Sequence, residues 1–274
     1  MPQKKSFFKT LFLVSIFALT SYSCCGRYRE LNSIPNNVSK VNRSLKSTVA
    51  FIKLRPVESS ANNTNGLLYT PPYCAGFFIS SKIIISAAHC FQEIMEVLVE
   101  NHIVRIPITT NLIGDKVLFS RYQEITDSGR IVKRHPQEAK IIYQNFDNDF
   151  VMLRISQNVT PSRYYFRLAN KLPNVGTTVY SIGHPFGLGW SMFDGIISRI
   201  IREDGERRPN LVQVSNTTIF GCSGGVLLNS NGEVIGMGRE FLSIPTIGIY
   251  ISSLKMRDLI QESRERHRHI IHFQ

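Results

Sequence analysis

The pattern of apolar positions after residue 46 predicts a protein built from short β-strands. Apolar runs recur at short intervals with turn residues between them, at 49–54, 76–85, 103–106, 150–155, 179–182, 226–228 and 234–237. They are rich in Ile, Val and Phe, which favour strands. Nothing between them resembles the long crossover helices of a parallel sheet, so we predict an all-β, antiparallel barrel or sandwich in one domain spanning 47–263.

The first 23 residues have the pattern of a secretory signal peptide. Lys4, Lys5 and Lys9 precede an apolar run at 11–19, and small residues follow it. That run is shorter than the ~20 apolar residues that a membrane-spanning helix needs. We therefore expect an exported protein, secreted or otherwise extracytoplasmic.

Cys24 leaves a second location open. The sequence Ser-Tyr-Ser-Cys at 21–24 resembles a bacterial lipoprotein cleavage box, although serine replaces the leucine expected three residues before the cysteine. A lipid-anchored protein is therefore the alternative to free secretion. The segment 24–46 is polar and rich in Asn and Ser, and is predicted to be an arm or a tether.

The end of the domain is expected to hold one short helix before a basic tail at 264–274. Ser252 or Ser253 can cap a segment that places Met256, Leu259 and Ile260 on one face. The net charge is +12, but outside the tail the basic residues are scattered. We interpret them as a solvated surface and expect no nucleic-acid partner, while a polyanion-binding module remains a weaker alternative.

Ser223 lies between glycines in the sequence Phe-Gly-Cys-Ser-Gly-Gly at 220–225, which predicts a tight, exposed turn. A serine hydroxyl is a poor nucleophile unless a base takes its proton, and the oxyanion that develops needs hydrogen-bond donors. The amides of Gly221 and Ser223 are the candidate donors, because glycine leaves the backbone unobstructed. Taken alone, this motif also occurs in ordinary turns.

His89 ends the apolar segment Ile-Ile-Ile-Ser-Ala-Ala-His-Cys at 83–90, where a lone histidine is usually structural. The small alanines beside it leave room for a carboxylate next to the ring. A disulfide between Cys90 and Cys74 would fix the turn, and export permits one. Such rigidity suits a general base, whose imidazole must reach a hydroxyl with one nitrogen and a carboxylate with the other.

Asp149 opens the apolar strand at 150–155 and is the candidate partner of His89. An aspartate at this place can also be a simple turn residue. Asp147 competes for the role, but Asp149 directly abuts the strand and is better placed to be buried and held.

These three motifs, in the order His, Asp, Ser, resemble the trypsin-like (chymotrypsin-fold) serine proteases. Further stretches are similar to the protease domain of the HtrA/Deg group, at 181–189, 195–198, 232–236 and 247–249. The resemblance extends from about residue 47 to about residue 260. It implies two antiparallel six-stranded β-barrels, with His89 and Asp149 in the first barrel, Ser223 in the second, and the active site between them.

The same resemblance implies an exported serine endopeptidase that acts on polypeptide substrates through an acyl-enzyme, without a cofactor or a metal. Ser223 would attack the peptide carbonyl, His89 would move the proton, and Asp149 would orient His89. A catalytically silent homologue that binds partners through the same cleft is the alternative.

Cys222 departs from the family pattern. Animal digestive proteases have aspartate here, which pairs with an N-terminus released by cleavage, and the HtrA group usually has asparagine. We therefore expect activity that does not depend on such an N-terminus. Cys222 is either a small buried residue or a thiol whose oxidation silences Ser223.

The substrate pocket and the C-terminal end complete the expectations. In this fold the base of the primary pocket lies about six residues before the serine, which points to Thr217, with Asn216 and Thr218 beside it. No acid is present there to bind Lys or Arg, so we expect a preference for small or medium apolar side chains. Only the basic tail follows the last predicted helix, so no PDZ domain is expected.

Overall fold

The computed structural model describes residues 43–52, 54–56, 67–69, 72–99, 102–108, 112–122, 136–216, 219–241 and 246–271. The predicted signal peptide, most of the predicted arm with Cys24, and Thr217 lie outside the described residues. Within the described ranges, no helix is both long enough and apolar enough to span a membrane.

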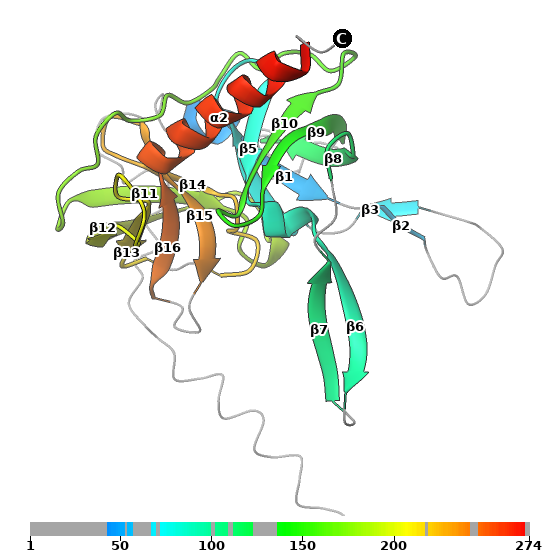
Figure 1. Ribbon diagram of the computed structural model, residues 1–274, viewed down its shortest axis with the longest axis horizontal. Helices are drawn as coiled ribbons and strands as arrows, with labels where there is room; N and C mark the ends of the chain where they lie inside the picture. The colour runs from blue at the N-terminus through cyan, green and yellow to red at the C-terminus, as the bar shows by residue number, and fades with distance from the viewer. Residues whose placement is uncertain are drawn as a thin grey trace, which may run out of the picture.

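Six antiparallel strands close a first barrel in the order β1-β4-β5-β10-β9-β8 (Figure 1). Its core is aromatic, because Phe51, Phe77, Phe78, Phe119 and Phe150 are all fully buried. The strands are β1 (Thr48–Ile52), β4 (Cys74–Phe78), β5 (Ile83–Ser86), β8 (Lys116–Arg121), β9 (Gln137–Asn145) and β10 (Phe150–Ile155).

A second barrel follows in the order β11-β12-β13-β16-β15-β14, again antiparallel. Its interior is aliphatic, with Val179, Ile197, Val212, Leu227 and Ile235 fully buried. The two barrels confirm the fold expected from the sequence. The strands are β11 (Thr178–Gly183), β12 (Ser191–Ile201), β13 (Leu211–Val214), β14 (Val226–Leu228), β15 (Val234–Phe241) and β16 (Gly248–Ser252).

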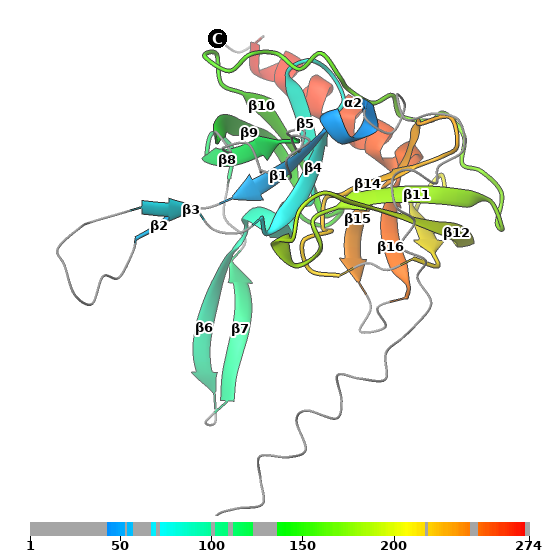
Figure 2. The same cartoon turned by 180° about the vertical axis from the view of Figure 1, so that it is seen from behind.

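Two smaller two-stranded sheets extend from the first barrel, as both ribbon views show (Figures 1 and 2). One pairs β2 (Leu54–Pro56) with β3 (Leu67–Tyr69), and the other pairs β6 (Glu93–Val99) with β7 (His102–Ile108). Both lie outside the closed barrels.

The apolar run at 76–85 forms parts of two strands. Ser80 Oγ accepts hydrogen bonds from the amides of Lys82 and Ile83, at 3.3 and 3.1 Å, and the chain turns back there. Phe77 of β4 therefore pairs with Ile85 of β5. This hairpin delivers the segment that carries His89.

The C-terminal helix α2 (Ser253–Ile271) is longer than predicted. Residues 264–271, expected in a basic tail, continue the helix, and Arg266 pairs with Glu262 one turn earlier. The helix packs against β15 and β16. It also reaches the first barrel, where the Arg266 guanidinium lies 5.6 Å from the centre of the Tyr143 ring.

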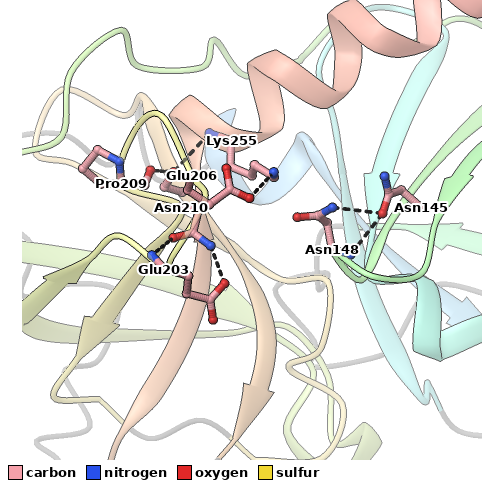
Figure 3. Close-up of polar contacts among 8 residues, drawn as sticks. Asn145, Asn148, Glu203, Glu206, Pro209, Asn210 and Lys255 are labelled. Carbon is pink, nitrogen blue, oxygen red and sulfur yellow. Dashed lines mark hydrogen bonds and ion pairs between the residues drawn. The ribbon is translucent and has the colours of Figure 1, made fainter.

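The start of α2 is latched to the connection between β12 and β13 (Figure 3). Ser252 Oγ accepts a hydrogen bond from the Lys255 amide at 3.1 Å, which makes Ser252 the N-cap, and donates one to the Pro209 carbonyl at 2.6 Å. Lys255 Nζ lies 2.5 Å from a carboxylate oxygen of Glu206. The helix therefore begins where a capped end and a partly buried ion pair coincide.

Replacing Ser252 by alanine tests this latch. The Ser252→Ala variant loses the cap and the bond to Pro209, so its free energy of unfolding should fall by about 1–2 kcal/mol. Urea denaturation measures the change. The matched control is Ser230→Ala in an exposed turn, which should stay within about 0.5 kcal/mol of the wild type; equal effects of the two changes would contradict the latch.

Candidate active site

His89 and Asp149 are joined by two hydrogen bonds. His89 lies in a short 3-10 helix (Ala88–Phe91) that directly follows β5, and Asp149 immediately precedes β10, the neighbour of β5. The imidazole Nδ1 donates to Asp149 Oδ2 at 2.8 Å, and the His89 amide donates to Asp149 Oδ1 at 2.8 Å. Since a carboxylate only accepts, the Nδ1 tautomer is set and Nε2 is left to accept a proton.

The pair is asymmetric in its exposure to solvent. The side chain of His89 is 42% exposed, whereas that of Asp149 is 12% exposed. A shielded carboxylate behind an accessible imidazole is the arrangement that orients a base toward substrate. Asp147, the competing candidate, is exposed and takes no part in this pair.

Asp149 has a left-handed backbone conformation, with φ of 48°, which is uncommon for a residue other than glycine. The preceding turn holds it there: the Asp149 amide donates to the Phe146 carbonyl at 2.9 Å. Asn145 Oδ1 accepts from both the main-chain and side-chain nitrogens of Asn148, each at 3.0 Å (Figure 3). The Asn-Phe-Asp-Asn sequence before Asp149 is the signal for this turn.

Ser223 lies in the second of two consecutive turns, which share Cys222 and which we together call the nucleophile turn (residues 219–225). The Cys222 amide donates to the Ile219 carbonyl at 3.0 Å, and the Gly225 amide donates to the Cys222 carbonyl at 2.8 Å. The third residue of each turn has a positive φ, 91° at Gly221 and 74° at Gly224. Both are therefore type II-like turns that need glycine at those places.

The amides around Ser223 divide into two groups. Those of Cys222, Gly224 and Gly225 donate to backbone carbonyls. Within the described ranges, the amides of Gly221 and Ser223 donate to no backbone acceptor. These are the two donors that the sequence assigned to the oxyanion, so their geometry suits that role.

The nucleophile turn presses directly on the first barrel. The Ala75 amide of β4 donates to the Ser223 carbonyl at 2.8 Å. A Cβ atom at Gly224 would lie 2.3 Å from the Ala75 carbonyl oxygen and 3.0 Å from the Ala87 nitrogen. The backbone of Ser223 is thus held against the residues that lead to His89.

The disulfide between Cys74 and Cys90 strengthens the same region. The structure joins the two cysteines, whose Cα atoms lie 6.1 Å apart. Cys74 and His89 with Cys90 also place three potential metal-ligating atoms within 4.8 Å. Both sulfurs are used in the disulfide, so this group does not have the thiolates that a metal site would require.

The remaining contact of the expected triad is open. His89 Nε2 lies 4.0 Å from Cys90 Sγ, and among the described residues no hydrogen bond joins it to Ser223 Oγ. Catalytic hydrogen bonds are often long without substrate and tighten in the bound complex. The structure therefore brings the turn with Ser223 against the segment that leads to His89, without a hydrogen bond between the two side chains.

Cys222 is buried, with 8% of its surface exposed, and is a free thiol. Burial raises the pKa of the Cys222 thiol, and hydrogen bonds with the backbone of Ile219 and His184 act in the opposite direction. A Cβ atom at Gly183 would lie 2.9 Å from Cys222 Sγ, so the thiol fills a narrow space.

Of the residues expected at the pocket, Thr217 and Thr218 lie outside the described residues and Asn216 is buried. Asn216 Nδ2 donates to Ser181 Oγ at 2.9 Å and to the Tyr250 hydroxyl at 2.8 Å. Both of these hydrogen bonds of the side-chain NH2 group therefore go to the second barrel. Asn216 can shape a pocket wall, but it does not offer that NH2 group to a substrate.

Comparison with known proteins indicates the family of this chain. The family model of the trypsin-like peptidase domain matches residues 74–237, which include His89, Asp149 and Ser223. The chain is 33% identical over 131 residues to the periplasmic pH-dependent serine endoprotease DegQ of Escherichia coli. It is 31% identical over 137 residues to the periplasmic serine endoprotease DegP of the same organism.

These matches cover 46% and 47% of this chain and 29% of each relative, so the match spans less than a third of those proteins. A crystal structure of the serine endoprotease from Yersinia pestis has the same fold, with a TM-score of 0.53 at 20% identity. That alignment covers 86% of this chain and 66% of the other. The family model, which matches more than half of the chain, shows that this protein belongs to the trypsin-like peptidase domain family.

Proposed function

We propose that this protein is an exported serine endopeptidase that cleaves polypeptides through an acyl-enzyme. The observation that carries the proposal is the double hydrogen bond between His89 and Asp149, placed beside a nucleophile turn in which, among the described residues, the amides of Gly221 and Ser223 donate to no backbone acceptor. The similarity to serine endoproteases of the DegQ and DegP type supports the same activity.

In the proposed reaction the four residues of the site have different roles. Ser223 Oγ attacks the scissile carbonyl while His89 Nε2 takes its proton and then passes it to the leaving amine. Asp149 keeps the imidazole in the required tautomer, and the amides of Gly221 and Ser223 stabilise the oxyanion. Water then releases the acyl group from Ser223, with His89 again acting as the base.

A catalytically silent binding protein is the competing function. It has no need for an oriented imidazole with a shielded carboxylate behind it, and a strained backbone is costly to keep. The strained backbone of Asp149 therefore favours the enzyme.

Export is supported by three independent features. The N-terminal sequence resembles a signal peptide, the relatives DegQ and DegP are named as periplasmic, and a disulfide such as Cys74–Cys90 persists in oxidising compartments. Thr217 remains the candidate for the base of the substrate pocket.

Cys222 fits the role of a small buried residue better than that of a redox switch. A reactive cysteine is accessible and has a lowered pKa, whereas Cys222 is buried and its pKa is raised. Its thiol fills the space beside Gly183 and supports the turn from within.

A fluorophosphonate probe tests the proposed function. The wild-type protein should be labelled at Ser223, because the probe reacts only with an activated serine. Labelling should disappear in Ser223→Ala and His89→Ala, as read by mass spectrometry of the labelled peptide. An unlabelled wild type, with its fold intact by circular dichroism, would favour the silent homologue.

The role of Asp149 is tested by amide substitution. In Asp149→Asn the side chain donates where it must accept, so kcat for peptide hydrolysis should fall by about 10⁴. Asp147→Asn removes the same charge two residues away and serves as the matched control. If the two variants lost activity equally, the loss would reflect charge in the turn rather than orientation of His89.

The role of Cys222 is tested by oxidation. Wild type and Cys222→Ser should lose activity at the same rate in dilute peroxide, since the buried thiol is largely protonated and shielded. Iodoacetamide should modify Cys222 only after the protein unfolds. Selective protection of the Cys222→Ser variant would show instead that oxidation of this thiol controls Ser223.

A further inference from the structure

His184 is a fully buried histidine at the boundary between the two barrels. It directly follows β11 of the second barrel, and its exposed fraction is 0%. Its imidazole Nε2 lies 3.2 Å from the carbonyl oxygen of Val49, in β1 of the first barrel. Because a carbonyl only accepts, Nε2 carries the proton and donates across the boundary.

The main chain of His184 braces the nucleophile turn. Its amide donates to the Gly221 carbonyl at 3.2 Å, and the Phe186 amide donates to the Phe220 carbonyl at 2.8 Å. The His184 carbonyl is so close that a Cβ atom at Gly221 would lie 2.0 Å from its oxygen. The segment 184–186 therefore contacts the peptide groups on both sides of Gly221.

The bond to Phe220 has a direct consequence for the proposed oxyanion donor. The Phe220 carbonyl and the Gly221 amide belong to the same planar peptide group. Fixing the direction of that carbonyl on the Phe186 amide also fixes the direction of the Gly221 N–H. The position of the segment 184–186 thus sets where one of the two oxyanion donors points.

Aromatic contacts extend the brace to the first barrel. The rings of His184 and Trp190 meet edge to face, with centroids 4.5 Å apart. Trp190 in turn contacts Tyr122 in the same manner at 5.5 Å, and Tyr122 directly follows β8 of the first barrel. A hydrogen bond therefore connects His184 to β1, and two edge-to-face ring contacts connect it to the residue after β8.

These contacts lie close to the other tie between the barrels. Val49 pairs with Gly76 in β4. The residue before Gly76, Ala75, donates its amide to the Ser223 carbonyl. The hydrogen bond from Ala75 thus holds the chain at Ser223, and the hydrogen bond from His184 to Val49 holds the segment that orients Gly221. Both are anchored on neighbouring strands of the barrel that carries His89 and Asp149.

We propose that His184 is a positioning residue for peptide hydrolysis, whose imidazole holds the Gly221 amide in register with the first barrel. The inference rests on the proposed function, because it concerns the oxyanion donors of that reaction. A histidine that only fills the core would affect stability. A positioning residue must affect kcat, since the oxyanion develops in the transition state.

The test compares His184→Gln with His184→Met. These side chains have nearly the same size and reach, but only glutamine keeps a donor close to the place of Nε2. We expect the Met variant to lose at least about 10-fold in kcat with KM within about twofold, because loss of an oxyanion donor costs ~10²–10³. The Gln variant should stay within about threefold of the wild type.

Two controls separate stability from positioning. Ile235→Val weakens the fully buried core of the second barrel and should lower the melting temperature without lowering kcat. Trp190 is the only tryptophan of the chain, so its fluorescence reports on the contact with His184. Its emission should change in the Met variant and remain close to wild type in the Gln variant.

The outcomes distinguish this inference from the proposed function. Fluorophosphonate labelling of the wild type tests the function alone. Equal kcat in the Met and Gln variants of a labelled protein would overturn the positioning role. Unchanged Trp190 emission in a folded Met variant would overturn the tie between the barrels, whether or not turnover is measured.

Discussion

The close approach of the nucleophile turn to the first barrel is the constraint on which the site depends. Ser223 belongs to one barrel, and His89 with Asp149 belongs to the other, so the proposed catalytic groups meet only where the barrels touch. Contact at this point requires backbone against backbone, because any side chain at Gly224 would collide with the Ala75 carbonyl. The hydrogen bond between Ala75 and Ser223 then holds the two barrels at that distance.

Each half of the site depends on residues with a positive φ that the surrounding structure supports. In the first barrel, Asp149 takes a left-handed conformation because the Asn145 side chain and the Phe146 carbonyl close the turn before it. In the second barrel, Gly221 and Gly224 supply the positive φ angles that place Ser223 at the tip of two turns. The strain at Asp149 persists only where neighbours over-determine the conformation, which is typical of active sites.

The peripheral elements reinforce the pairing of the barrels. The helix α2 packs its apolar face into the same buried cluster as residues of both barrels, through Met256, Leu259 and Ile260. Its far end reaches Tyr143 in the first barrel, and its start is latched beside Pro209. Like the hydrogen bond of His184 to Val49, these contacts join the two barrels.

Local patterns in the sequence determined much of this protein. The apolar runs indicated an antiparallel all-β fold, and three short motifs named His89, Asp149 and Ser223 in their order. Several strands escaped the pattern, among them β9 and β12, because polar and charged residues interrupt their apolar positions. The length of α2 was also underestimated, since its last turns depend on side-chain pairs rather than on an apolar face.

Only the tertiary structure decided which contacts complete the site. Ala75 meets Ser223, and Val49 meets His184, only because the two barrels pack together, and sequence spacing carries no record of those distances.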